Sequence, residues 1–339
     1  MRFGIFDHME FRGDPLQQLY EERLEMLAYA DSAGFWCYHK AEHHFIQLDA
    51  APSANVFLAA ASQRTQHIRL GSLVYLLPFY EPIRLIEEIC CLDHLCNGRL
   101  QVGVGKGISP AEHKLWGLPP DQARERFEEA FDIVRNGLLH KTLNHDGVRR
   151  HYADADLPLR PLQDPHPPFW YPGNVDYAGR HRLNTITAGP TAMVAKAVTT
   201  YNELLDSAEY DWNPGVIRPT IGVTRHLYVA ETDALALARV RQAYPVYHDN
   251  LAHLFKRYKI PFQPPGDPSF DGDVDAALAF EGLVAGSPDT IKHHIERVRD
   301  ETGIDYFVGA FAWGDLNHSE VMASLELYAK EVMPTFTQV

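Results

Sequence analysis

Residues 35–45 read Phe35-Trp36-Cys37-Tyr38-His39-Lys40-Ala41-Glu42-His43-His44-Phe45. The bulky apolar run over 35–38 is typical of a short buried strand. Three consecutive ionisable side chains follow at 42–44, and such groups are costly to bury unless they line a cavity or reach solvent. The stretch therefore predicts a buried strand that ends at a polar site.

Outward from this stretch, apolar strands alternate with helical periodicity along the chain. Strands are predicted over 3–6, 35–38, 68–77, 100–104, 169–171, 183–187, 220–230 and 306–311. Helices are predicted between them, with Ser287 and Pro288 opening one and Asn317 with Glu320 forming a capping box at another. This alternation favours a closed (β/α)8 TIM barrel of the α/β class, and a doubly wound open sheet is the alternative.

Residues 144–168 and 258–275 fit neither a strand nor a helix, because both are rich in Pro and Asp. Long irregular insertions in a barrel usually cover its mouth. We therefore expect both segments as insertions at the C-terminal face of the strands and as candidate lids. Neither a repeat nor a linker interrupts the pattern, so one domain over 1–339 is predicted.

The composition excludes several classes of partner and location. With 31 basic and 45 acidic side chains, the formal net charge is −14, so nucleic acids and anionic membranes would be repelled. The four cysteines form no Cys-x-x-Cys pair, which favours a reducing cytosol over disulfide-bonded export. No apolar stretch approaches the length of about 18 residues that a membrane span needs. A cytoplasmic protein is predicted.

The Glu42-His43-His44 segment has three interpretations on its residues alone. One is a polar loop that happens to contain two histidines. Another is a metal site, but adjacent histidines at a strand end tend to point to opposite faces, so no metal is expected. The third is proton transfer by one imidazole, which is favoured because imidazole titrates near neutrality.

Two glycine-containing turns follow later strands. Gly103-Val104-Gly105-Lys106-Gly107 could bring backbone amides and one cation to an anion, or could only permit a tight turn. It matches neither the P-loop nor the dinucleotide-binding pattern. Gly173-Asn174-Val175 opens a helix and presents N–H groups that suit a phosphate, although other strand-to-helix loops share this feature.

Taken in order, these pieces resemble the bacterial luciferase-like flavin monooxygenases. The resemblance lies in residues 1–6, 33–35, 42–45, 68–71, 77–78, 92–93, 97–100, 286–288 and 303–305. It implies a TIM barrel that uses reduced FMN and O2 to oxygenate a small organic substrate. It also implies a separate NAD(P)H:flavin reductase as the source of reduced FMN, and a homodimer.

The resemblance assigns roles to individual residues. His43 would help proton transfer beside the flavin, and Glu42 would border its ring. The implied cofactor-binding residues are Leu73, Val74, Lys106, Gly173, Asn174 and Val175. Among these, Leu73-Val74 falls where the family often has a non-prolyl cis peptide, and Lys106 would contact the phosphate. A mixed aromatic and apolar substrate pocket is expected from His8, Tyr75, Trp170 and Trp313, although such aromatic residues also build cores.

Three alternatives remain at this point. The same fold could serve hydride transfer with a deazaflavin or FMN, and oxygen uptake would separate that activity from oxygenation. A metal-dependent barrel hydrolase could use His43 or His44, and stoichiometric zinc would indicate it. A non-catalytic flavin-binding subunit is the third alternative. The presence of Glu42, His43 and Lys106 argues against it.

Overall fold

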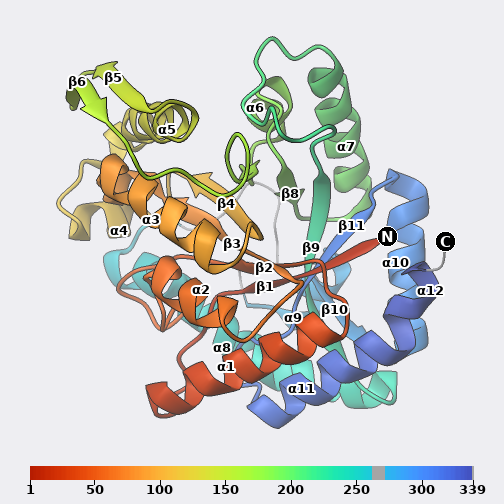
Figure 1. The fold of residues 1–339 in the computed structure, drawn as a ribbon. Helices are drawn as coiled ribbons and strands as arrows, with labels where there is room; N and C mark the ends of the chain where they lie inside the picture. The colour runs from red at the N-terminus through yellow and green to blue at the C-terminus, as the bar shows by residue number, and fades with distance from the viewer. Residues whose placement is uncertain (262–271, 338–339) are drawn as a thin grey trace.

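The computed structural model describes residues 1–261 and 272–337, and a parallel β-sheet forms its centre (Figure 1). The strands that form a ring are β1 (Arg2–Asp7), β2 (Cys37–Lys40), β3 (Arg69–Leu76), β4 (Leu100–Gly105), β7 (Phe169–Trp170), β8 (Thr185–Thr187), β9 (Ile221–Val229) and β11 (Tyr306–Ala310). Their order is β9-β11-β1-β2-β3-β4-β7, and β8 pairs with β9. A parallel bridge between Trp170 and Asn184 joins β7 to the residue before β8 and closes the ring. The predicted (β/α)8 barrel is confirmed.

Helices surround the ring. They are α1 (Leu16–Ser32), α2 (Ala54–Ser62), α3 (Pro82–Leu95), α4 (Pro110–Leu115), α5 (Ala123–Leu139), α6 (Val175–Arg180), α7 (Thr191–Asp206), α8 (Asp233–Tyr258), α9 (Val274–Ala279), α10 (Pro288–Thr302), α11 (His318–Leu327) and α12 (Met333–Thr337). Two predicted helix starts are confirmed. Ser287 caps α10 with Pro at its first turn, and Asn317 and Glu320 form the capping box of α11.

The core has two parts, one inside the barrel and one between the barrel and its helices. The inner cluster consists of Cys37, Leu73, Trp170, Ile186, Tyr306 and Val308, with Phe6, Trp36 and Val74 packed against it. The larger outer cluster joins the helices to the outward faces of the strands. Since successive strand residues point to opposite faces, this division decides which side chains can reach the barrel mouth.

Three elements differ from the prediction. β10 (Leu283–Gly286) is an additional short parallel strand that pairs with the end of β9. The segment 144–168 is not irregular throughout, because β5 (Thr142–Asp146) and β6 (His151–Asp156) form an antiparallel hairpin. β2 begins at Cys37 instead of Phe35, and the N–H group of Phe35 bonds back to the Ala30 carbonyl in α1.

The β5–β6 hairpin packs near the C-terminal end of β3. The Tyr152 hydroxyl donates to Glu81 over 2.6 Å, and the Arg150 guanidinium donates to the Tyr80 carbonyl over 3.1 Å. No residue of the hairpin lines either of the two cavities described below, and its role as a lid stays a prediction. In the second candidate lid, 258–275, residues 262–271 lie outside the described residues.

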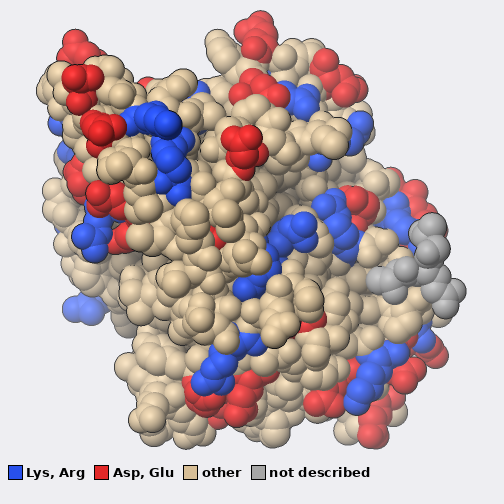
Figure 2. All heavy atoms as spheres, viewed as in Figure 1, with Lys and Arg blue, Asp and Glu red and all other residues tan. Residues whose placement is uncertain are grey.

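Acidic and basic side chains are interspersed over the face shown in Figure 2, so the negative net charge is not concentrated in one patch on this face.

Within 1–261 and 272–337, no helix combines the length and apolar character that crossing a bilayer requires.

Candidate active site

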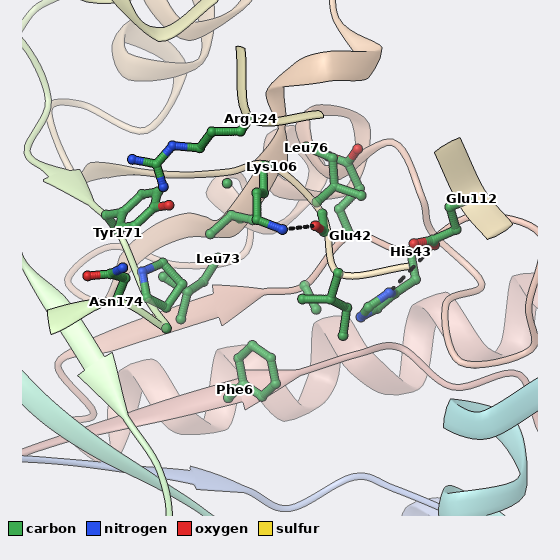
Figure 3. A pocket seen from close by; sticks show the side chains of 17 residues that line it. Phe6, Glu42, His43, Leu73, Leu76, Lys106, Glu112, Arg124, Tyr171 and Asn174 are labelled. Carbon is green, nitrogen blue, oxygen red and sulfur yellow. Dashed lines mark hydrogen bonds and ion pairs between the residues drawn. The ribbon is translucent and has the colours of Figure 1, made fainter. Parts of the chain in front are cut away.

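A cavity of about 360 Å³ opens among the loops that follow the strands, where barrel active sites lie. Its walls come from the ends of β1 to β4 and the loop after β7. They consist of Phe6, Ala41, Glu42, His43, Leu73, Val74, Leu76, Gly105, Lys106, Gly107, Ile108, Glu112, Arg124, Tyr171, Pro172, Gly173 and Asn174. In Figure 3 the side chains of Arg124, Tyr171 and Asn174 lie at one end, and those of His43 and Glu112 lie at the other.

Two cations line the cavity. Lys106 follows β4 and Arg124 lies in the first turn of α5, so two separate elements bring cations to this cavity. Both side chains keep exposed surface. Lys106 Nζ contacts only a backbone carbonyl within the described chain, that of Gly107 at 3.3 Å, and so retains unused donors. Arg124 lies 5.1 Å from the Tyr177 ring and pairs with Glu128.

Arg124 was not predicted from the sequence. It lies at the first turn of an amphipathic helix in a run of alternating charges, where a cation usually faces solvent. Only the folded position of the α5 start brings it to the cavity that Lys106 also lines.

The other end carries an imidazole beside a buried carboxylate. His43 Nδ1 lies 3.7 Å from Glu112 Oε1, and the same oxygen accepts the backbone N–H of His44 at 2.7 Å. Glu112 belongs to α4, is almost fully buried and was also missed from the sequence. A carboxylate on the Nδ1 side favours the tautomer with the proton on Nδ1, which leaves Nε2 as the reactive nitrogen.

The two histidines point in different directions. His43 lines the cavity, whereas His44 Nε2 contacts Glu42 Oε1 at 3.0 Å and its ring packs edge-on against Trp116. Glu42 also accepts from the Tyr80 hydroxyl at 2.6 Å. Burial raises the pKa of Glu42, against the lowering effect of these two hydrogen bonds. His44 therefore holds Glu42 in place, while His43 faces the cavity.

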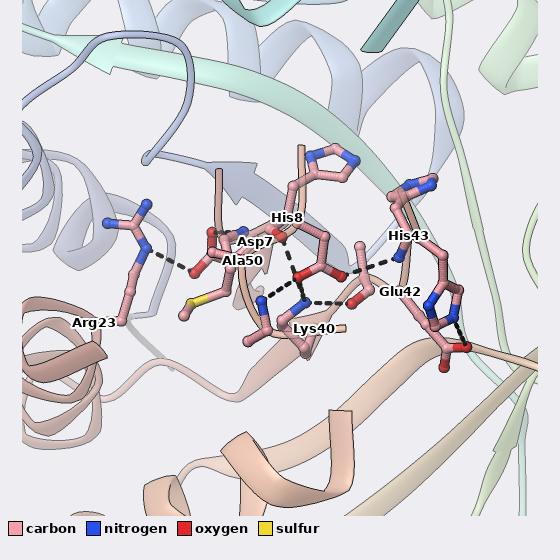
Figure 4. A network of polar contacts seen from close by, with 12 residues as sticks. Asp7, His8, Arg23, Lys40, Glu42, His43 and Ala50 are labelled. Atoms are coloured by element: carbon pink, nitrogen blue, oxygen red, sulfur yellow. Dashed lines mark hydrogen bonds and ion pairs between the residues drawn. The ribbon is translucent and has the colours of Figure 1, made fainter. Parts of the chain in front are cut away.

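A buried ion pair fixes the backbone of this segment (Figure 4). Lys40 Nζ donates to Asp49 Oδ1 over 2.8 Å, and both side chains are fully buried. Asp49 Oδ2 accepts the backbone N–H of His43 over 3.0 Å. Lys40 also donates to the carbonyls of Ala41 and His8 at 2.6 and 3.4 Å. One pair thus connects the end of β2 to the loop after β1.

Close backbone approach explains why glycine occupies the end of β4. A Cβ on Gly105 would lie 2.6 Å from Val74 Cγ2, and one on Gly103 would lie 2.3 Å from the Ser72 carbonyl oxygen. The Leu73–Val74 peptide bond is cis, as the resemblance implied. Leu73 and Val74 both line the cavity beside Gly105.

A second cavity of about 470 Å³ adjoins the first and shares Phe6, Leu73, Pro172 and Gly173 with it. Its remaining walls are Val175, Ile186, Thr187, Ala188, Ala197 and Thr224. No side chain in this lining is ionisable, in contrast to the first cavity. All the predicted cofactor residues therefore line one cavity or the other.

The four residues expected in a substrate pocket separate. His8 lies next to His43, with ring centroids 5.5 Å apart. Trp313 is buried and packs edge-on against His226 at 5.7 Å. Tyr75 faces outward instead, where its hydroxyl donates to Asn55 on α2. Trp170 fills the barrel interior, where its Nε1 donates to Gln101 at 2.8 Å. None of the four lines either of the two cavities.

Across residues 1–261 and 272–337, no group of three or more His, Cys, Asp or Glu side chains is arranged to hold a metal ion. The first cavity fits a flavin mononucleotide instead. Two cations and a glycine turn suit a phosphate, and apolar residues with one imidazole suit a flat ring system.

Comparison with known proteins agrees with this geometry. The model of the luciferase-like monooxygenase family matches residues 1–306. The chain belongs to this family. It is 27% identical to the oxygenase component of the flavin-dependent trigonelline monooxygenase of Acinetobacter baylyi, over all of this chain and 96% of that protein. The family predicted from the sequence is thereby confirmed.

Solved structures share the fold. The oxygenating constituent of 3,6-diketocamphane monooxygenase from Pseudomonas putida, in complex with FMN, superposes with a TM-score of 0.82 at 20% identity, covering 100% of this chain and 99% of that one. An F420-dependent secondary alcohol dehydrogenase superposes with a TM-score of 0.72 at 17% identity, covering 99% of each chain. Among the two predicted activities, the named relatives favour the flavin-dependent monooxygenase.

Proposed function

We propose that the protein is the oxygenase component of a two-component flavin monooxygenase, which binds reduced FMN and inserts one oxygen atom of O2 into a small organic substrate. The observation that carries this proposal is the polarity of the first cavity. Arg124 stands at one end, and Lys106 lies between it and Glu42. His43 with its carboxylate stands at the other end. This arrangement orients a molecule that has a phosphate at one end and reacts at the other.

Each residue has a distinct part. Lys106 and Arg124 bind the phosphate, with the N–H groups of the 173–175 turn. Phe6, Leu73 and Val74 provide apolar contact to the ring and exclude water from it. When bound, reduced FMN supplies the electrons that activate O2. His43 exchanges a proton through Nε2 with the reacting groups, while Glu112 on the Nδ1 side keeps the ring in the required tautomer.

Several partners follow from this role. A separate NAD(P)H:flavin reductase supplies the reduced FMN, which is supported by the likeness to the oxygenase component of the trigonelline monooxygenase. The four free cysteines fit a cytoplasmic location. A homodimer remains part of the proposal on the family resemblance alone.

Oxygen uptake with purified components tests the proposal. The protein is mixed with FMN, NADH and a flavin reductase, and substrate-dependent oxygen consumption is measured for a panel of ketones, terpenes and heteroaromatic compounds, with product mass analysed for one added oxygen. The proposal expects at least one product heavier by one oxygen atom, labelled from ¹⁸O₂. Substrate oxidation that proceeds without oxygen and requires F420 would contradict it and establish the hydride-transfer alternative.

A further inference from the structure

Beyond His43, the barrel mouth holds two more imidazoles that the proposed reaction does not use. His8 follows β1 and His226 lies on β9. Their rings are nearly parallel, at an interplanar angle of 12° and a centroid distance of 6.5 Å. The His8 ring lies 5.5 Å from that of His43, so the three form one continuous row.

The alternation of side chains along β9 places His226 on the same face of the strand as a residue that lines the second cavity. Thr224, two residues earlier on the same strand, lines the second cavity, and residues two apart on a strand share a face. His226 therefore faces the barrel mouth one pleat further toward its C-terminal end. Arg225, between them, points outward toward Glu281.

Aromatic rings surround His226. Tyr247 lies 4.3 Å from it, and Trp313 stands edge-on at 5.7 Å. Burial lowers the pKa of His226 to about 4 and that of His8 well below its usual value. At neutral pH both rings are uncharged, so this wall offers hydrogen bonds without a charge that could balance an anion.

His226 also has an unused hydrogen-bonding atom. Its Nε2 is buried and bonds to none of the residues that the structure describes. An unsatisfied buried polar atom costs about 1–3 kcal/mol. Among the buried imidazoles with such an atom, His226 is singled out by its place in the row that begins at His43. His226 lines neither of the two cavities, and its connection to the first one is the row of rings through His8 to His43. A substrate oxygen bound along this row would complete the unused atom.

We propose that His226 recognises the oxygen of an uncharged substrate, a ketone, aldehyde or alcohol whose hydrocarbon part packs against the neighbouring rings. The proposal rests on the proposed function, because it takes the flavin ring to end near His43. It predicts selection for carbonyl or hydroxyl compounds over hydrocarbons of the same shape and over carboxylates.

The test compares ketones with their exocyclic methylene analogues, which keep the shape and lose the oxygen. Cyclohexanone with methylenecyclohexane, and the equivalent pairs built on two and three fused rings, are titrated against protein loaded with oxidised FMN. Binding is followed by the change in the flavin absorption spectrum. Wild type should bind at least one ketone ten or more times more tightly than its analogue, and the matching carboxylate should bind more weakly than the ketone.

Variants assign this preference to His226. His226→Phe should reduce it to less than threefold with FMN affinity retained, and His226→Gln should restore part of it, because the Gln side chain keeps a polar atom near the position of Nε2. His294→Phe is the matched control, since His294 is also a buried imidazole with an unbonded Nε2, but lies on α10 behind the barrel. It should keep the wild-type preference.

Two outcomes overturn the inference: no ketone preference in wild type across the panel, or an unchanged preference in His226→Phe. Failure of FMN to bind wild type would instead overturn the proposed function, so the two failures are distinguishable.

Discussion

Single residues divide the site into groups that bind and groups that react. Lys106 and Arg124 reach the cavity from separate elements and lie apart from His43, which contacts Glu112. A phosphate contact is made equally in the ground and transition states, whereas a proton transfer is made only in the transition state. Substitution of Lys106 or Arg124 should therefore change the dissociation constant for FMN, and substitution of His43 should change kcat.

His43→Ala should lower kcat by about 10²–10⁴-fold, the usual range for a lost general acid or base. The dissociation constant for FMN should stay within threefold of wild type. Stopped-flow turnover and a separate FMN titration measure the two quantities. His44→Ala gives the comparison, because His44 supports Glu42 and does not line the cavity. Equal kcat values for His43→Ala and wild type would refute the proton role.

Arg124→Ala should weaken FMN binding by about 10–100-fold, because a charge-assisted hydrogen bond contributes roughly 1.5–3 kcal/mol. Arg124→Lys should recover part of the loss, and Lys114→Ala, an exposed cation on α4, should leave affinity unchanged. Isothermal titration with FMN at two salt concentrations measures the effect. An Arg124→Ala variant with wild-type affinity would remove this residue from the phosphate site.

Some residues of the site could be predicted from the sequence, and others could not. His43, Lys106 and the 173–175 turn lie in recognisable motifs directly after strands, so their places could be predicted. Arg124 and Glu112 come from helix starts with no motif, and only the folded structure brings them to the cavity. Tyr75 was expected at the mouth. The register of β3 against β4 shifts between Ser72 and Tyr75, so the alternation of side chains along the sequence does not show to which face Tyr75 points.

At the level of elements, two buried networks hold the loops that carry the site. The Lys40–Asp49 pair positions the segment after β2, and Glu10 connects the loop after β1 to α8 and to the loop before α11. Glu10 accepts from Asn250 at 3.1 Å and from the Gly314 backbone at 2.5 Å. Most strands were predictable from their apolar runs. β10 was not, because its four residues run directly into the cap of α10.

Asp49→Asn should destabilise the protein by about 3–5 kcal/mol, because it leaves the Lys40 charge buried without a counter-charge. The Lys40→Met/Asp49→Leu double variant should recover part of this loss, with lower activity because the His43 N–H loses its acceptor. Denaturant unfolding monitored by fluorescence measures both. A loss below 1 kcal/mol for Asp49→Asn would show that the pair is not needed for stability.

Glu10 should make stability depend on pH. Burial raises its pKa to about 7, against 4.5 for an ordinary glutamate, so the folded state holds a proton that the unfolded state has released between these values. The contribution of Glu10 to stability should therefore fall as pH rises from 4.5 to 7, by an amount on the order of 1–3 kcal/mol. Glu10→Gln should flatten this slope in unfolding experiments at pH 5 and pH 8. An identical slope in the variant would refute the assignment.

For the whole molecule, the barrel brings residues from distant parts of the sequence to one mouth. Phe6 and Asn174 line the same cavity because the ring closes between β1 and β11 and between β7 and β8. The regular alternation of strands and helices made this closure predictable from the sequence. The relative position of the two cavities was not, since it depends on which loop residues turn inward.

The central claim is that the first cavity binds a flavin by its phosphate, with the ring toward His43. The most direct measurement compares the affinities of reduced FMN and reduced riboflavin, which lacks the phosphate, by anaerobic titration of wild type and the Lys106→Ala/Arg124→Ala variant. We predict that wild type binds FMN at least a hundredfold more tightly than riboflavin and that the double variant binds the two within threefold. Equal affinities in wild type, or a preference that survives in the double variant, would contradict this account.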